Sequence, residues 1–196
     1  MKIVCLGDSI TGVSDLSRYL KWSHILECMI DAKMGPGACS VLNRGIGGNT
    51  TADILARLQK DVLDEKPDLV VLLIGGNDAA PGKLAREETR RNLDGILGSL
   101  RAAGCRILAL QYAVLEIPDA PEKTWRHLDG NNDLIAEATK EHGAVLLDLG
   151  PPMQAARAAL PFAALVCPAD GVHLNPGGEL VVARQVFARL TELGWA

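Results

Sequence analysis

The chain has 196 residues, of which 48% are hydrophobic and 22% charged, and these proportions are typical of one globular domain rather than of a disordered or fibrous chain. We therefore expect a single domain over residues 1–196 with a sizeable buried core. The 20 basic and 24 acidic side chains give a formal net charge of -4, and basic residues gather on no segment, which argues against nucleic-acid binding and against stable association with a membrane.

The N-terminal segment and the cysteines bear on the compartment in which the protein works. Residues 1–6 form too short an apolar run for a signal peptide, and no stretch approaches the length of a transmembrane span. The five cysteines are dispersed without a C-x-x-C pair, which fits neither a disulfide framework nor a zinc site, so we expect most of them to be buried. The four histidines show no metal-ligand spacing either. We predict a cytoplasmic protein that uses no cofactor and no metal.

Short apolar runs alternate with helical patterns along the chain. Clusters of Val, Ile and Leu are typical of parallel strands buried on both faces, and the five predicted strands are residues 2–6, 40–43, 69–74, 106–112 and 144–147. Apolar stripes with helical spacing lie in the first three intervals, at residues 20–30, 54–62 and 93–100. This alternation predicts a three-layer α/β domain with a doubly wound, mainly parallel sheet, whose ligand site lies at the carboxyl ends of the strands.

Residues at the boundaries agree with the predicted helices. Asn49 or Thr50 is suited to cap the second helix. Pro176 is suited to the first turn of the last helix, and Gly194 follows the end of that helix. The Ala-rich segment 155–164 is expected to be helical in part.

A serine follows the first predicted strand. Residues 7–11 read Gly-Asp-Ser-Ile-Thr, which places Ser9 near free backbone N–H groups at the start of a helix, where an alkoxide or a neighbouring oxyanion would be stabilised. The same residues suit a simple turn in which Asp8 or Ser9 caps the helix. Taken alone the motif favours the turn, and it makes Ser9 a candidate nucleophile only in combination with other residues.

Two further motifs follow the second and third predicted strands. Residues 45–50 read Gly-Ile-Gly-Gly-Asn-Thr, and such glycines allow a backbone N–H to approach a substrate or simply form a flexible turn before a helix. Residues 75–78 read Gly-Gly-Asn-Asp, so that the amide of Asn77 either donates to an oxyanion or forms an Asx turn. Each motif is ambiguous by itself.

An aspartate and a histidine stand three residues apart near the C-terminus. Residues 170–173 read Asp-Gly-Val-His, just before Pro176. The carboxylate of Asp170 can hold Nδ1 of His173 and leave Nε2 free to accept a proton from a serine. An exposed His beside an Asp is more often an ordinary surface pair. The four motifs together, however, supply a nucleophile, a base, its orienting carboxylate and oxyanion donors at one edge of the sheet.

The sequence resembles the SGNH or GDSL hydrolases over nearly its whole length, because it matches the four blocks of that family in order, at residues 7–10, 45–48, 75–78 and 170–173. The resemblance implies a flavodoxin-like SGNH fold with a Ser9, His173 and Asp170 triad. It also implies an oxyanion hole formed by the N–H groups of Ser9 and Gly48 and by the side chain of Asn77. Gly48 is preferred because the family's glycine precedes Asn or Asp and then Thr. Ile10 replaces the leucine of the family's name and leaves the chemistry unchanged.

Other mechanisms fit the sequence less well. A dinucleotide-binding loop lacks its third glycine, since Thr50 stands in its place, and it would follow the second strand instead of the first. A P-loop fails because Asn77 stands where its first glycine should be. The α/β-hydrolase motif G-x-S-x-G is also missing around Ser9. A silent binding module would be indicated by loss of the triad residues or Asn77, all of which are present, whereas an acyltransferase would use the same motifs.

The substrate follows less directly from the sequence. Members of the resembled family cleave acetylated carbohydrates, simple esters, thioesters and lysophospholipids. Because the chain has no large insertion to build a long acyl tunnel, we expect a small or short-chain carboxylic ester, for example an acetyl ester of a carbohydrate, with thioesterase, lysophospholipase and acyltransferase activities as alternatives. The apolar residues Leu160, Phe162, Leu165 and Val166 fit an acyl pocket, a core contact or the contact surface of a homo-oligomer.

Overall fold

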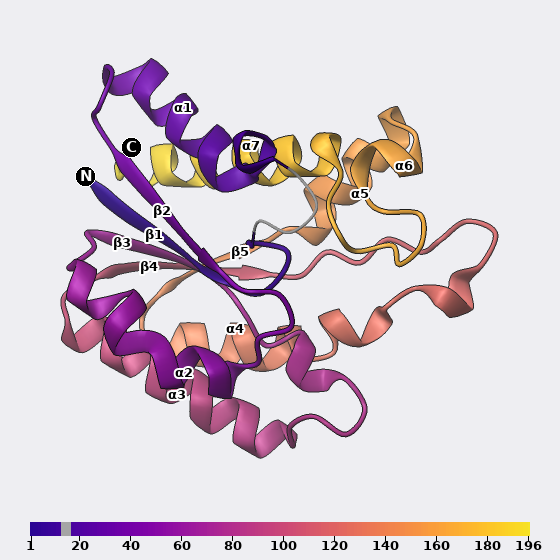
Figure 1. Cartoon of the computed structure of the whole chain (residues 1–196), viewed down its shortest axis with the longest axis horizontal. Helices are drawn as coiled ribbons and strands as arrows, with labels where there is room; N and C mark the ends of the chain where they lie inside the picture. The colour runs from indigo at the N-terminus through magenta and orange to yellow at the C-terminus, as the bar shows by residue number, and fades with distance from the viewer. Residues whose placement is uncertain (13–16) are drawn as a thin grey trace.

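The computed structural model describes residues 1–12 and 17–196, and a five-stranded parallel sheet lies at its centre (Figure 1). The strands are β1 (Lys2–Gly7), β2 (Ser40–Gly45), β3 (Leu69–Leu73), β4 (Arg106–Gln111) and β5 (Val145–Asp148). Their order across the sheet is β2-β1-β3-β4-β5, and every neighbouring pair is parallel. The predicted doubly wound sheet is confirmed, and the strand ends differ from prediction by one or two residues.

Helices cover both faces of this sheet and form the outer layers. The α-helices are α1 (Trp22–Met34), α2 (Thr51–Asp61), α3 (Arg86–Ala102), α4 (Asn132–Glu141), α5 (Gly150–Ala159), α6 (Phe162–Leu165) and α7 (Pro176–Glu192). Helices α1 and α7 pack together on one face, whereas α2, α3 and α4 line the other (Figure 1). Short 3-10 helices are η1 (Arg18–Leu20), η2 (Leu63–Glu65), η3 (Asn77–Ala79), η4 (Pro121–Lys123) and η5 (Arg126–Asp129). The domain therefore has the predicted three-layer α/β/α architecture.

Helix boundaries follow the capping residues that the sequence offers. Thr50 caps α2 in a capping box, in which its backbone N–H donates to Asp53 at 2.8 Å while its hydroxyl accepts from the N–H of Asp53. Pro176 opens α7, as expected. Leu20, which the apolar stripe placed in the first helix, lies instead in η1 and is 43% exposed. The α-helix begins only at Trp22 because Lys21, just before it, has an extended backbone.

The core consists of the strands and the inner faces of the helices. All five residues of β3 are buried, as a central strand covered on both faces requires. Of the five free cysteines, only Cys5 and Cys39 are buried and Cys28 is exposed, so the expectation that most are buried is wrong. Among the residues that the structure describes, no helix combines the length and apolar character needed to cross a bilayer.

Candidate active site

The loops that follow the strands bring Ser9, His173 and Asp170 together at the carboxyl edge of the sheet. Ser9 Oγ lies 2.8 Å from Nε2 of His173, and Nδ1 of the same ring lies 2.9 Å from Oδ2 of Asp170. When Nδ1–H donates to Asp170, Nε2 is left as the acceptor of the serine proton. The three side chains therefore form a continuous hydrogen-bonded chain from carboxylate to hydroxyl, although 164 residues separate Ser9 from His173.

The loop around Asp170 fixes the carboxylate by local hydrogen bonds. Oδ1 of Asp170 accepts from the backbone N–H of Val172 at 2.8 Å and of His173 at 2.9 Å. Burial opposes ionisation of this carboxyl, but the hydrogen bonds from the His173 ring and from these backbone groups lower its pKa below its ordinary value. Gly171 has a φ of +75°, and a Cβ there would lie 2.4 Å from the carbonyl oxygen of Leu115, so a larger residue would displace the loop.

Asp8 holds the loop that carries Ser9 from one side. Its Oδ1 accepts from the N–H of Ile10 at 2.9 Å, and its Oδ2 accepts from the hydroxyl of Tyr112. The Asp8 side chain is almost fully buried, and this burial raises its pKa to about 6 even though both hydrogen bonds lower it. Asp8 thus acts within the protein and does not face solvent.

A buried ion pair holds the same loop from the other side. Lys21 pairs with Glu179 of α7, and both residues are almost completely shielded from solvent. The ammonium of Lys21 also donates to the carbonyl of Ile10 at 3.1 Å, while Glu179 accepts from the N–H of Trp22 at 2.7 Å. Asp8 is therefore tied to the residue that follows β4, whereas Ile10 is tied through Lys21 to the start of α1 and to α7.

The predicted oxyanion donors lie on two neighbouring loops. Asn77 begins η3, and its Nδ2 donates to the carbonyl of Asn49 at 3.0 Å, which links the two loops. The glycine loop passes beside the serine, because a Cβ on Gly47 would lie 3.7 Å from Cβ of Ser9. Gly48 has a φ of +76° with open space around it, a conformation that favours glycine. The arrangement leaves one N–H of the Asn77 amide for a further partner.

Asp78 connects the loop that carries Asn77 to helix α2. It is completely buried, and its carboxylate accepts from the N–H of Thr51 at 3.0 and 3.1 Å and from the hydroxyl of that residue. Burial raises the pKa of Asp78, against the hydrogen bonds from Thr51. Since Thr51 is the first residue of α2, this carboxylate fixes the loop that carries Asn77 to the start of a helix.

Two aromatic residues beside the site were not singled out in the sequence. Trp125 is 44% exposed, and its ring meets the His173 ring edge-to-face, with centroids 5.3 Å apart. The N–H of Trp125 also donates to the carbonyl of Asp170 at 3.1 Å. Tyr112 was assigned to the end of a strand and lies instead just after β4, beneath Asp8. Only the expectation that a ligand site lies at the carboxyl ends of the strands pointed to this part of the chain.

The apolar segment after α5 belongs mainly to the core. Phe162, Leu165 and Val166 are buried in the hydrophobic cluster, whereas Leu160 is 41% exposed. The sequence allowed an acyl pocket, a core contact or an oligomer surface for these residues, and the core contact accounts for the three that are buried. The carbonyls of Ala163 and Val166 accept from the Asn175 side chain, which ties α6 to the start of α7.

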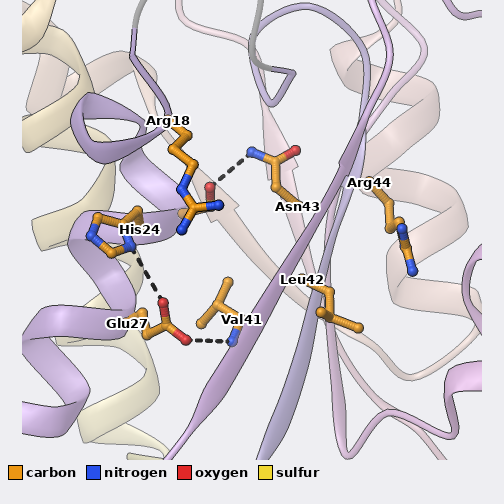
Figure 2. A pocket seen from close by; sticks show the side chains of 8 residues that line it. Arg18, His24, Glu27, Val41, Leu42, Asn43 and Arg44 are labelled. Carbon is orange, nitrogen blue, oxygen red and sulfur yellow. Dashed lines mark hydrogen bonds and ion pairs between the residues drawn. The ribbon is translucent and has the colours of Figure 1, made fainter.

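A separate cavity of about 330 Å³ lies between α1 and the edge strand β2 (Figure 2). At this cavity, Glu27 pairs with His24 and accepts from the N–H of Val41, and Asn43 donates to Ser23 at 2.8 Å (Figure 2). Ser9, His173 and Asp170 are not among the residues that line this cavity. Its polar side chains are thus largely engaged with one another.

The parallel sheet carries a serine, a histidine and an aspartate at its carboxyl edge, an arrangement that can perform acyl transfer. Comparison with known proteins defines the family: the model of the GDSL-like Lipase/Acylhydrolase family matches residues 5–180. The chain belongs to this family, and it is a carboxylic ester hydrolase with the SGNH fold.

The relatives span most of the chain. An uncharacterized lipoprotein of Bacillus subtilis, YqeF, is 28% identical over 92% of this chain and 85% of its own length. An acetylxylan esterase of Geobacillus stearothermophilus is 27% identical over 79% of this chain and 72% of its own length. The crystal structure of LAE5, an alpha/beta hydrolase enzyme from the metagenome of Lake Arreo, Spain, superposes with a TM-score of 0.80 and 26% identity, and covers 99% of this chain and 95% of that one.

Proposed function

We propose that the protein removes acetyl or other short acyl groups from a carbohydrate ester, with Ser9 as nucleophile, His173 as general base and Asp170 as the residue that orients His173. The observation that carries this proposal is the hydrogen-bonded chain from Asp170 Oδ2 to His173 Nδ1, at 2.9 Å, and from His173 Nε2 to Ser9 Oγ, at 2.8 Å. Distances of this size are within the reach needed for proton transfer between nucleophile and base.

The reaction proceeds in two steps. Ser9 Oγ attacks the ester carbonyl while its proton passes to Nε2 of His173, and the tetrahedral intermediate then expels the alcohol, which takes that proton. A water molecule next attacks the acyl-enzyme, giving its proton to His173, and the acid leaves as Ser9 recovers the proton. The carboxylate of Asp170, whose pKa is held low by its hydrogen bonds, stabilises the imidazolium that forms in both steps.

Three N–H donors stabilise the negative charge on the carbonyl oxygen. They are the backbone N–H of Ser9, the backbone N–H of Gly48 and the side-chain amide of Asn77. The hydrogen bond from Asn77 to the carbonyl of Asn49, at 3.0 Å, holds the amide in place before the substrate arrives. Preorganised donors of this kind act strongly because they need no rearrangement as the charge develops.

Replacing Asn77 with alanine is expected to lower kcat by about 10² to 10³ and to leave the fold intact, because one oxyanion donor is lost. The matched variant Asn77→Asp keeps the shape of the side chain but offers no N–H group, and because its carboxylate also repels the oxyanion it should lose at least as much activity. Steady-state kinetics with a p-nitrophenyl acetate substrate measures both. If Asn77→Ala keeps the wild-type kcat, Asn77 is not an oxyanion donor.

Trp125 supports a carbohydrate as the alcohol part of the substrate. The leaving alcohol takes its proton from Nε2 of His173 and therefore departs beside that ring, where Trp125 packs with centroids 5.3 Å apart. His127 stacks on Trp125 at an angle of 29°, which holds the indole in place. An exposed, fixed aromatic face of this kind offers apolar surface to the C–H face of a sugar ring.

We expect Trp125→Ala to raise KM for acetylated xylooligosaccharides on the order of tenfold, because a ring-stacking contact is lost, and to leave KM for ethyl acetate within about twofold. The control variant is Trp195→Ala, which removes the tryptophan that packs under Arg106 and should change neither value. Acetate release measured by a coupled assay gives the four comparisons. Equal effects on KM for both substrates would contradict a role of Trp125 in binding the sugar ring. Faster cleavage of octanoyl esters than of acetyl esters would indicate a thioesterase or lysophospholipase instead.

A further inference from the structure

Tyr112 lies where two loops meet: the nucleophile loop, residues 7–10, which carries Ser9, and the oxyanion loop, residues 75–78, which carries Asn77. Its side chain is only 4% exposed, and its hydroxyl donates to Oδ2 of Asp8 at 2.5 Å. The other oxygen of the same carboxylate accepts from the N–H of Ile10 at 2.9 Å. The hydrogen bonds thus run from the residue that directly follows β4 through Asp8 to the peptide directly after Ser9.

The ring of Tyr112 also lies against the oxyanion loop. Gly76, which precedes Asn77, is so close that a Cβ on it would come within 2.8 Å of Cζ of Tyr112. The contact leaves no room for a side chain at this position. Tyr112, directly after β4, therefore contacts both the residue before Ser9 and the residue before Asn77.

We propose that Tyr112 is a positioning residue of the active site: through Asp8 and Gly76 it sets the distance between the Ser9 hydroxyl and the oxyanion donors. This inference rests on the proposed function of Ser9 and Asn77. Tyr112 need not touch the substrate, since its effect passes through the two loops that it joins. A packing residue of the same shape without the hydroxyl would fill the space and lose the connection to Asp8.

The charges around Asp8 determine how this connection depends on pH. Burial raises the pKa of Tyr112 well above its ordinary value, as does the Asp8 carboxylate, so the phenol remains a donor. The carboxylate is also influenced by His173, which lowers the pKa of Asp8, and by Asp78, which raises it. Because the hydrogen bond from Tyr112 also lowers the pKa of Asp8, removing that hydroxyl raises the pKa of Asp8 above about 6.

The test is Tyr112→Phe, compared with Tyr19→Phe, which removes the hydroxyl of an exposed tyrosine. We expect kcat for p-nitrophenyl acetate to fall about ten- to a hundredfold in Tyr112→Phe, with KM changed by less than about twofold. The acid limb of kcat/KM should also move to higher pH, because Asp8 then protonates more readily. Neither change is expected in Tyr19→Phe.

The outcomes separate this inference from the proposed function. If Tyr112→Phe keeps the wild-type kcat and acid limb, Tyr112 is a packing residue only, whether or not its melting temperature falls. If Tyr112→Phe fails to fold, Asp8→Asn is measured instead. The acid limb of kcat/KM should then contain one more protonation in the wild type than in Asp8→Asn, because the variant has no carboxyl group at this position. Identical acid limbs would overturn the inference. Activity that survives in Ser9→Ala would contradict the proposed function itself, whereas the results for Tyr112→Phe test only the role of Tyr112.

Discussion

Replacing Ser9 with alanine is expected to lower kcat for acetyl esters by on the order of 10⁴-fold or more, because the covalent route is lost and only the oxyanion donors and substrate binding remain. This loss should exceed that of Asn77→Ala, since removing one donor leaves the covalent route open. Initial rates of acetate release from p-nitrophenyl acetate measure both variants. Such a difference between them would assign the acyl-enzyme to Ser9.

The control for this comparison is Ser17→Ala, which removes a hydroxyl that accepts from the N–H of Tyr19 at the start of η1. It is expected to keep wild-type activity. Labelling by a fluorophosphonate provides the second readout, because the reagent should add to wild type and to Ser17→Ala and not to Ser9→Ala. Turnover at the wild-type rate by Ser9→Ala would overturn the triad.

The edge of the sheet at which the site lies could be predicted from the sequence. Short apolar runs are typical of buried parallel strands, and in such a sheet the residues after each strand meet at one edge. The motifs that contain Ser9, Gly48 and Asn77 follow β1, β2 and β3 in the structure, as the sequence predicted. The spacing of Asp170 and His173 was similarly informative, because a carboxylate three residues before a loop histidine reaches its Nδ1.

The partners that hold the site from the interior could not be predicted in this way. Asp8 and Tyr112 are 104 residues apart, and Lys21 and Glu179 are 158 apart. No local period or motif links such pairs, and their contact depends on the packing of side chains from different elements. Trp125 lies in an irregular loop, where the conformation that brings its ring beside His173 follows from the hydrogen bond of its N–H to the carbonyl of Asp170.

Glu179→Gln is expected to lower the free energy of unfolding by about 3 to 5 kcal/mol, because the ammonium of Lys21 would remain buried without its counter-charge. Burial raises the pKa of Glu179 against the effect of Lys21, and the pair is almost completely shielded from solvent. Urea unfolding monitored by circular dichroism gives the free energy. Because Lys21 also donates to the carbonyl of Ile10, activity should fall together with stability in this variant.

The matched control is Glu192→Gln, which breaks an exposed ion pair with Arg189 in the same helix and should change stability by less than about 1 kcal/mol. The double variant Lys21→Met with Glu179→Leu removes both buried charges and is expected to recover much of the stability lost in Glu179→Gln, because no ion is left unpaired. It should recover less of the activity, since the hydrogen bond to Ile10 is still missing. An unfolding free energy in Glu179→Gln equal to that of Glu192→Gln would contradict the importance of burial at this pair.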